Sequence, residues 1–386
     1  MIIIMKVKKF FIILIIIILF NLINFPISMA SGIEQIDLDY ALSNLNIYAP
    51  SALLIEKSTG DILYQKEAFT PMYPASTVKM MTAILVLENC SLDEPVTVSE
   101  FAISAVPQGY TLSSIQVGEI LSVRDLLYAL LVPSGNDAAN VLAEYVAGNV
   151  ENFATMMNEK ATQLGCKNTN FTNPNGVHDV NMYTTAYDLA LIAKYAMDIE
   201  EFRTIISTEI YTLPSTNIYP ADDRVLHNSN HLINSSSTDY YEYATGIKTG
   251  YTNAAQNCLV AGAKKDDVEF ISVILGSTFG NTTEQSKFVD AKTLFEFGFT
   301  YHYNYYQEKI MAQQSDTWSR VFNFEDIINT DLIVDENNKP RWGYVFYLIA
   351  RTTLILIAIL YLFYRFIYKL RRYNYNRKHA KYDFKY

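Results

Sequence analysis

The chain has 386 residues, of which half are hydrophobic, and a formal net charge of −10 at pH 7. The negative charge is concentrated in residues 31–340, where 17 Lys and Arg stand against 39 Asp and Glu, a balance of −22. So acidic a segment argues against a nucleic acid as partner, because phosphates bind basic surfaces. The three cysteines form no CxxC pair and the five histidines show no metal-binding spacing, so no metal or other cofactor is expected.

Residues 1–30 have the layout of a secretory signal peptide. They carry three lysines at positions 6, 8 and 9, continue with an unbroken apolar run, and end in "SMAS", with small residues at positions 28 and 30. We therefore predict export and cleavage after this segment. An uncleaved membrane anchor is the alternative interpretation.

A second apolar stretch, residues 344–368, is 25 residues long. About 20 apolar residues suffice to cross a bilayer as a helix. Arg351 interrupts the run close to one end, where a long side chain can extend to the headgroups. The tail, residues 369–386, carries seven Lys and Arg against Asp383, which predicts a cytoplasmic side. A helix lying in the membrane interface is the alternative, but the run is apolar on every face.

Between these stretches the sequence predicts a hairpin, a block of helices, an antiparallel meander and a last helix. Capping boxes at Ser122 with Asp125 and at Thr185 with Asp188 mark two of the helix starts. The predicted strands are residues 51–67 (two strands and a turn), 243–250, 258–263 and 268–277, and the helices are 73–88, 122–131, 136–147, 150–164, 186–198 and 284–297. This order predicts an α/β protein of the α+β kind: an antiparallel sheet covered by helices, with an all-helical insert.

The segment "YPASTVKMMTAILVLE" (residues 73–88) places a lysine in an apolar helix. Ser76 and Lys79 are three residues apart and so share one helix face. Burial and the positive end of the helix favour a neutral amine, which can take a proton from a serine hydroxyl. This Ser-x-x-Lys pattern occurs once in the chain, and it predicts an activated nucleophile.

Two further short motifs follow in order. Ser134-Gly135-Asn136 begins 58 residues after Ser76, at a break between helices, and Lys248-Thr249-Gly250 follows 112 residues after Asn136, on a predicted strand. A second Ser-x-Asn, at Ser215, lies in an irregular polar stretch and is set aside. Each motif alone is weak, since Lys248 could be a solvated strand residue and Ser134 a helix cap. Their order and structural context make the combined signal specific.

Through "YPASTVKMMTA", "PSGNDAAN", "YTTAYDLA" and "GIKTGYTNAAQNCLVAGA" the sequence resembles the D-alanyl-D-alanine carboxypeptidases. These are penicillin-binding proteins related to the serine β-lactamases. The resemblance covers about residues 35–300. It implies that fold, a peptidoglycan stem peptide ending in D-Ala-D-Ala as substrate, and β-lactams as covalent inhibitors.

The resemblance also implies roles for individual residues. Ser76 would be the acyl-ester nucleophile, Lys79 its proton acceptor, and Ser134 a relay of protons to the leaving D-alanine. Asn136 would hold an amide of the substrate.

On the last motif, Lys248 and the Thr249 hydroxyl would bind the terminal carboxylate of the substrate. Gly250 allows a close approach of backbone. The oxyanion would lie between the backbone N–H groups of Ser76 and Tyr251. His178 lies in a segment that the family shares and is given no chemical role.

The sequence thus predicts a carboxypeptidase that is exported and held at the bacterial cell membrane by a single C-terminal span. The predicted parts are a signal peptide (1–30), a catalytic domain (31–298), a spacer (299–343), a transmembrane helix (344–368) and a cytoplasmic tail (369–386). The spacer is shorter than the β-rich second domain of many family members. A β-lactamase is the alternative enzyme, although no Glu-x-x-x-Asn follows the Ser-Gly-Asn motif. A non-catalytic wall-binding scaffold is the alternative outside enzymes.

Overall fold

The computed structural model describes residues 45–220, 224–278 and 286–302, and the single residues 42, 361, 364 and 365. The chain divides into two compact units, Met1–Tyr306 and Gln307–Tyr386. The predicted signal peptide and almost all of the predicted spacer, span and tail lie outside the described residues, so these assignments stay predictions. No helix in the described part of the chain is long and apolar enough to cross a membrane.

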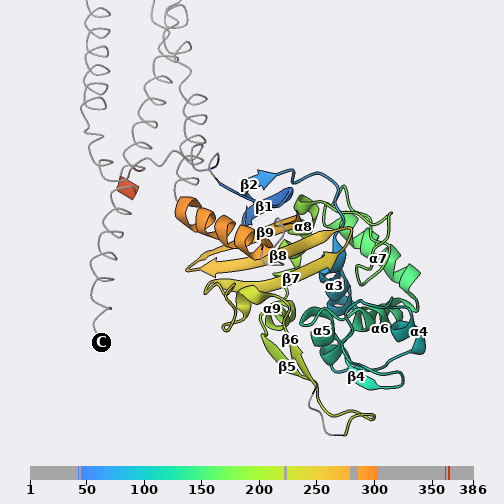
Figure 1. Ribbon diagram of the computed structural model, residues 1–386. Coiled ribbons are helices and arrows are strands. Elements are labelled where there is room, and N and C mark those ends of the chain that lie inside the picture. The colour runs from blue at the N-terminus through green and yellow to red at the C-terminus, as the bar shows by residue number, and fades with distance from the viewer. Residues whose placement is uncertain are drawn as a thin grey trace, which may run out of the picture. The chain divides into compact units, whose positions relative to one another are not determined.

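A five-stranded antiparallel sheet forms the centre of the first unit (Figure 1). Its strand order is β2-β1-β9-β8-β7. The strands are β1 (Ser51–Glu56), β2 (Ile62–Lys66), β7 (Ala244–Thr252), β8 (Gln256–Lys265) and β9 (Val268–Ser277). The N-terminal hairpin and the C-terminal meander join where β1 pairs with β9. The predicted sheet is therefore confirmed, and β7 is one of its edges.

Helices cover both faces of the sheet, which is why all six residues of β1 are buried. Leu53 and Ile55 point into a core shared with α3 and α8, whereas Leu54 points into a second core shared with the helix of residues 286–302. The helices of the insert are α3 (Lys79–Asn89), α4 (Glu100–Ser104), α5 (Val123–Leu131), α6 (Asn136–Ala147), α7 (Val150–Gln163), α8 (Ala186–Ala196) and α9 (Glu200–Ile206).

The insert also contains two small two-stranded sheets, so it is not wholly helical as predicted. They pair β3 (Pro95–Thr97) with β4 (Ile120–Ser122), and β5 (Ile210–Thr212) with β6 (Val225–His227). Strands of three residues are too short to show an alternating pattern. A 3-10 turn, η2 (His231–Ile233), follows β6.

The α-helix predicted for residues 73–88 starts later in the structure than the sequence suggests. It opens with a 3-10 turn, η1 (Ala75–Val78), and α3 starts at Lys79. Every residue from Lys79 to Val86 is buried, which confirms that this helix is in the core. The start of α3 is thus held rigidly by packing on all sides.

One of the two predicted capping boxes is only half present. Ser122 and Asp125 form both hydrogen bonds of the motif. At α8, Thr185 caps the helix by accepting from the Asp188 N–H, 3.0 Å, but the Asp188 carboxylate is directed elsewhere. Its Oδ2 accepts from the backbone N–H groups of Lys167 (3.2 Å) and Asn168 (2.8 Å) and from the Thr169 hydroxyl (2.7 Å). Asp188 therefore ties the chain between α7 and α8 to the helix.

We expect Asp188→Ala to lower the free energy of unfolding by about 3 kcal/mol, because buried donors lose an ionised acceptor. Thr185→Ala, which removes an ordinary N-cap, should cost only about 1 kcal/mol. Urea unfolding followed by fluorescence measures both. Equal losses in the two variants would show that the carboxylate contacts contribute little.

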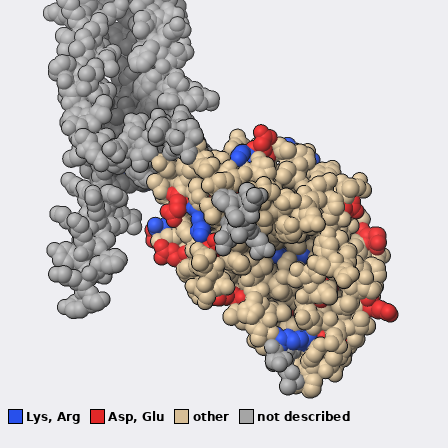
Figure 2. Space-filling model, in the orientation of Figure 1, with Lys and Arg blue, Asp and Glu red and all other residues tan. Residues whose placement is uncertain are grey.

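The charged side chains on the face shown in Figure 2 are scattered. In the part of the chain that the structure describes, this face shows no large patch of one sign: Lys and Arg lie beside Asp and Glu at the upper and left margins, and most of the surface between them is uncharged. The charges that matter for the site are the buried ones described next.

Candidate active site

Ser76 and Lys79 lie at the junction of η1 and α3. The Lys79 Nζ is 2.9 Å from the Ser76 Oγ. Lys79 is completely buried, whereas Ser76 is partly exposed. The serine is therefore accessible to a ligand and the amine that contacts it is shielded from water.

Two further oxygen atoms contact the Lys79 amine. They are the Asn136 Oδ1, at 2.9 Å, and the backbone carbonyl of Asn175, at 2.5 Å. The Asn136 Nδ2 donates to the Thr111 carbonyl (2.8 Å), so its Oδ1 faces the lysine. A neutral amine has two N–H donors and one lone pair. The Lys79 Nζ donates to these two oxygens and to the Ser76 Oγ; a neutral amine that keeps its two donors on Asn136 and Asn175 has its lone pair left for the Ser76 hydroxyl.

Electrostatics favours this neutral form. Burial, together with the positive charge of Lys248, holds the pKa of Lys79 well below its usual range, and the Asp137 carboxylate opposes part of that shift. An ammonium without water is strongly destabilised when its charge is not fully paired. Lys79 is thus suited to accept a proton from Ser76.

The Ser134–Asn136 turn connects α5 to α6. Ser134 is 8% exposed and lies two residues before Asn136. Buried Asp137 fastens the turn to the preceding loop, because its carboxylate accepts from the Ser113 N–H (2.9 Å) and the Ser113 hydroxyl (2.8 Å). A Cβ at Gly135 would lie 2.7 Å from the Ala129 carbonyl oxygen, so only glycine fits there.

Strained backbone accompanies each of the three motifs. Ala75 precedes the nucleophile with a φ of +48°, Ser134 has +71°, and Ile247 precedes Lys248 with +102°. A positive φ is unfavourable for any residue with a Cβ, and most of all for a β-branched one. Such conformations persist where the surrounding packing imposes them, and here they coincide with the predicted site.

The third motif lies on β7, whose free edge borders the nucleophile. A Cβ at Gly250 would lie only 3.0 Å from the Ser76 backbone nitrogen, so glycine permits the strand and the η1 turn to come together. Tyr251 follows with a side chain that is 54% exposed. The predicted close approach at Gly250 is therefore present in the fold.

Lys248 is buried (1% exposed) and its Nζ donates to the Thr249 carbonyl, 3.0 Å. Burial and the nearby positive charge of Lys287 lower the pKa of Lys248 to about 7. The Thr249 hydroxyl lies 2.6 Å from the Ser229 hydroxyl. The strand that borders the nucleophile thus carries a buried amine and, together with Ser229, a pair of hydroxyls.

This lowered pKa predicts a specific dependence of stability on pH. An unfolded lysine has a pKa of about 10.4, so between pH 7 and 10 the unfolded chain binds more protons than the folded chain, and stability rises with pH. Lys248→Met removes that contribution. The free energy of unfolding of the wild type should gain about 2 kcal/mol relative to Lys248→Met between pH 7 and 9, as measured by urea unfolding. Parallel pH profiles would contradict the lowered pKa of Lys248 in the folded state.

The structure brings Ser76, Lys79 and Asn136 into direct contact, with the Gly250 backbone beside Ser76. Ser134 lies in the turn between α5 and α6 that also carries Asn136. Lys248, Thr249 and Tyr251 lie on β7, on either side of Gly250.

Two contributors were not anticipated. Asn175 acts through its carbonyl, which no residue pattern encodes, and Ser229 contacts Thr249 from a polar stretch for which the sequence predicts no helix or strand. The signal that could have indicated the first is the adjacent Gly176. No cluster of His, Cys, Asp and Glu able to hold a metal occurs among the described residues.

Fold and site together define a class: a protein with an antiparallel sheet between helices, in which a buried lysine contacts a partly exposed serine and an edge strand borders that serine. A family model described as D-alanyl-D-alanine carboxypeptidase matches residues 39–278. The chain belongs to this family, peptidase S11.

Among proteins of known sequence, the chain is 35% identical over 265 residues to the D-alanyl-D-alanine carboxypeptidase DacF of Bacillus subtilis, covering 67% of this chain and 64% of DacF. It is 34% identical over 275 residues to a D-alanyl-D-alanine carboxypeptidase of Streptomyces sp. strain K15, covering 67% and 90%. The chain therefore spans less than two thirds of DacF.

Solved structures agree. The Streptomyces K15 DD-transpeptidase has a TM-score of 0.60 at 34% identity, covering 66% of this chain and 98% of that chain. A D-alanyl-D-alanine carboxypeptidase from Mycobacterium tuberculosis has a TM-score of 0.58 at 28% identity, covering 66% and 92%. The antiparallel sheet with helices on both faces is thus the DD-peptidase fold, as predicted.

Proposed function

We propose that this chain is a serine-type D-Ala-D-Ala carboxypeptidase that removes the terminal D-alanine from peptidoglycan stem peptides. The observation that carries the proposal is the position of the buried Lys79 amine, which lies 2.9 Å from the Ser76 Oγ and is held there by the Asn136 Oδ1 and the Asn175 carbonyl. Family membership supports the substrate class.

In acylation, the Ser76 oxygen attacks the carbonyl carbon of the penultimate D-alanine while Lys79 takes the hydroxyl proton. The oxyanion is stabilised by the backbone N–H groups of Ser76 and Tyr251. The C–N bond then breaks, the Ser134 hydroxyl gives its proton to the leaving amine and receives the proton held by Lys79, and D-alanine departs with Lys79 neutral again.

In deacylation, a water molecule attacks the ester carbonyl and gives a proton to the Lys79 amine. The ester bond breaks, the Ser76 oxygen recovers a proton, and the shortened peptide leaves as a carboxylate. A β-lactam would acylate Ser76 in the same way and remain bound, since ring opening leaves its amine attached.

The substrate carboxylate is assigned to Lys248 and the Thr249 hydroxyl, with Asn136 holding an amide of the peptide. A carboxylate beside Lys248 would raise the pKa of this lysine again, because an opposite charge favours the ammonium. Binding of substrate and protonation of Lys248 are therefore coupled.

We place the catalytic unit outside a bacterial cell, held at the membrane by residues 344–368, with the tail in the cytoplasm. The support is the sequence alone: a signal-peptide layout at one end, and an apolar run followed by basic residues at the other.

The experiment that tests the function is release of D-alanine from a stem pentapeptide by the purified chain, followed together with hydrolysis of a penicillin. We expect D-alanine release and a stable penicilloyl adduct. Rapid penicillin turnover without D-alanine release would indicate a β-lactamase, and neither reaction would indicate a non-catalytic wall-binding scaffold. Both outcomes would contradict the proposal.

Because one similar structure is named a DD-transpeptidase, the same assay should include glycine as an amine acceptor. Hydrolysis dominating over transfer supports a carboxypeptidase. A peptide product carrying the acceptor as the main species would reassign the chain to transfer.

A further inference from the structure

Helix α6 carries a second asparagine, Asn140, one turn after Asn136 and on the same face. Asn140 is 2% exposed, and its amide joins two other parts of the chain. The Nδ2 donates to the Ala102 carbonyl in α4, 3.1 Å, and the Oδ1 accepts from the Asn175 Nδ2, 2.9 Å. Because a carbonyl only accepts, the contact with Ala102 fixes which way the Asn140 amide points. The reaction proposed above gives Asn140 no role.

Asn175 uses its side chain and its backbone for different contacts. The side-chain Oδ1 accepts from the Val177 N–H, 2.8 Å, which leaves the Nδ2 for Asn140. The backbone carbonyl accepts from the Lys79 Nζ, 2.5 Å. Asn175 is 5% exposed, so these contacts are shielded from water. A chain of hydrogen bonds therefore leads from α4 through Asn140 and Asn175 to the Lys79 amine.

Helix α6 thereby determines the place of both oxygens that the Lys79 amine contacts besides the Ser76 hydroxyl. Asn136 does so directly through its Oδ1, 2.9 Å from the amine. Asn140 does so through the Asn175 carbonyl. Since the two asparagines belong to one packed helix, the spacing of the two oxygens depends on α6 as well as on the path of the loop.

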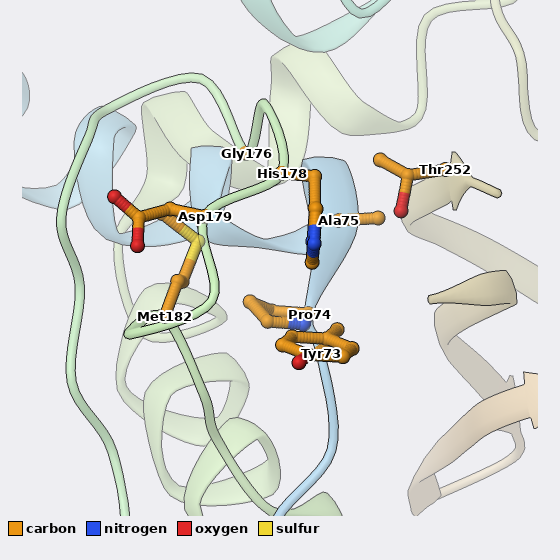
Figure 3. A pocket seen from close by; sticks show the side chains of 8 residues that line it. All are labelled: Tyr73, Pro74, Ala75, Gly176, His178, Asp179, Met182 and Thr252. Carbon is orange, nitrogen blue, oxygen red and sulfur yellow. The ribbon is translucent and has the colours of Figure 1, made fainter. Parts of the chain in front are cut away.

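The loop that carries Asn175 also lies against the nucleophile turn. Figure 3 shows Gly176, the next residue, close to Ala75 of η1. Ala75 directly precedes Ser76. A displacement of this loop would therefore change the position of the Lys79 amine relative to the Ser76 hydroxyl, and a misplacement of about 1 Å can reduce a rate by about 10²-fold.

Resting on the proposed function, we propose that Asn140 is a positioning residue for the reaction at Ser76. Its hydrogen bond to Asn175 holds the loop carbonyl where this carbonyl keeps the Lys79 amine against the serine hydroxyl. Asn140 acts through Asn175 and takes no part in the chemistry itself. Without Asn140, the Asn175 carbonyl can move, and the amine loses one of the acceptors that fix its place.

Loss of this contact should also change the charge state of the amine. Burial and Lys248 of β7 hold the pKa of Lys79 low, and Asp137 of α6 opposes them. A loosened loop admits water, which favours the ammonium, so the pKa of Lys79 should rise towards its usual value. A base acts only when it is unprotonated, so the acidic limb of the acylation rate should move to higher pH. A residue that merely stabilises the fold would leave this limb in place.

The test measures the rate of acylation of the full chain by a fluorescent penicillin as a function of pH, in the wild type and in Asn140→Ala. We expect the rate of Asn140→Ala to be lower by about 10- to 100-fold, with the acidic limb of the profile at higher pH. D-alanine release from a stem pentapeptide is measured in parallel.

A double-mutant cycle tests the path through the loop. Asn175→Ala removes the amide that binds Asn140 and keeps the backbone carbonyl. It should shift the acidic limb in the same direction. The double variant should be no slower than Asn175→Ala alone, because both changes break the same hydrogen bond.

Asn158→Ala is the matched control. Asn158 of α7 binds the backbone of Phe171, in the same loop, through its Nδ2 (2.8 Å) and its Oδ1 (2.7 Å). Asn158→Ala thus also removes an asparagine that ties this loop to a helix, but at a point away from Lys79 along the loop. The acylation rate and its pH profile should match the wild type.

An unmoved acidic limb in Asn140→Ala, at whatever rate, would overturn the positioning role. Additive losses in the double variant would overturn the path through Asn175, and an equal shift in Asn158→Ala would show that any loosening of the loop suffices and overturn the role of Asn140. If Asn140→Ala does not fold, Asn175→Ala decides, since it breaks the same hydrogen bond from the loop side.

The proposed function has a separate readout in this experiment. A wild type that is acylated but releases no D-alanine would overturn the proposed function, and the acylation profiles would still decide the role of Asn140. A wild type that is not acylated and releases no D-alanine would overturn both.

Discussion

Lys79→Met should reduce the rate of acylation by a fluorescent penicillin by about 10²–10⁴-fold, the usual contribution of a general base. Methionine matches the length of the lysine stem but offers no lone pair of comparable basicity to the Ser76 hydroxyl. Burial of the Lys79 amine destabilises the folded state, because the amine loses its hydration. Replacing it with an apolar side chain of the same length should therefore leave the protein folded. Near-UV circular dichroism should therefore match the wild type.

Two further variants serve as the negative and the positive control for this measurement. Ser76→Ala, which has no hydroxyl to acylate, should show no covalent label. Lys264→Met, at an exposed position on β8, should label at the wild-type rate. Acylation of Lys79→Met within about threefold of the wild type, far inside the 10²–10⁴ range of a general base, would mean that another group takes the proton.

Gly176→Ala should cost about 4 kcal/mol of unfolding free energy and lose most acylation activity. A Cβ at Gly176 would lie 2.1 Å from the Ala75 carbonyl oxygen and 2.8 Å from the Ser76 nitrogen. The backbone there also has a φ of +83°. Overpacking and left-handed strain each cost about 1–3 kcal/mol, and the forced shift would displace the adjacent Asn175 carbonyl from Lys79.

The control is Gly148→Ala at the end of α6. Gly148 has nearly the same φ, +80°, but a Cβ there meets nothing among the described residues within 4 Å. Gly148→Ala should lower the free energy of unfolding by only about 1 kcal/mol and leave the rate of acylation unchanged. Similar losses in both variants would show that backbone strain alone, and not the contact with the nucleophile turn, makes Gly176 necessary.

Both predictions concern the same arrangement. A lysine can act as a base only if its lone pair can reach the hydroxyl, and the four rotatable C–C bonds of its side chain would otherwise let the amine move away. Asn136 holds the amine from α6 and Asn175 from the opposite loop. Asn140, one turn after Asn136, supports this loop by accepting from the Asn175 Nδ2, 2.9 Å.

The local secondary structure and one helix cap could be predicted from the sequence. The apolar pattern of residues 73–88, the α5 cap at Ser122 and the three strands of the meander are all encoded by neighbours in the sequence, and the structure confirms them. The three motifs in order also indicated which parts of the chain should meet. Periodicity and capping act over a few residues, so one sequence suffices to detect them.

What the sequence alone determined about this protein is therefore its elements, its α+β class and the positions of the Ser-x-x-Lys, Ser-x-Asn and Lys-Thr-Gly motifs. Only the tertiary structure decided three contacts. The Asn175 carbonyl holds the Lys79 amine, the Ser229 hydroxyl contacts the Thr249 hydroxyl, and the Asp188 carboxylate accepts from Thr169 and not from the N-terminus of its own helix. These contacts join residues between 19 and 96 positions apart. A backbone carbonyl is identical in every residue, so its role depends on the path of the loop through space and not on the letter at that position.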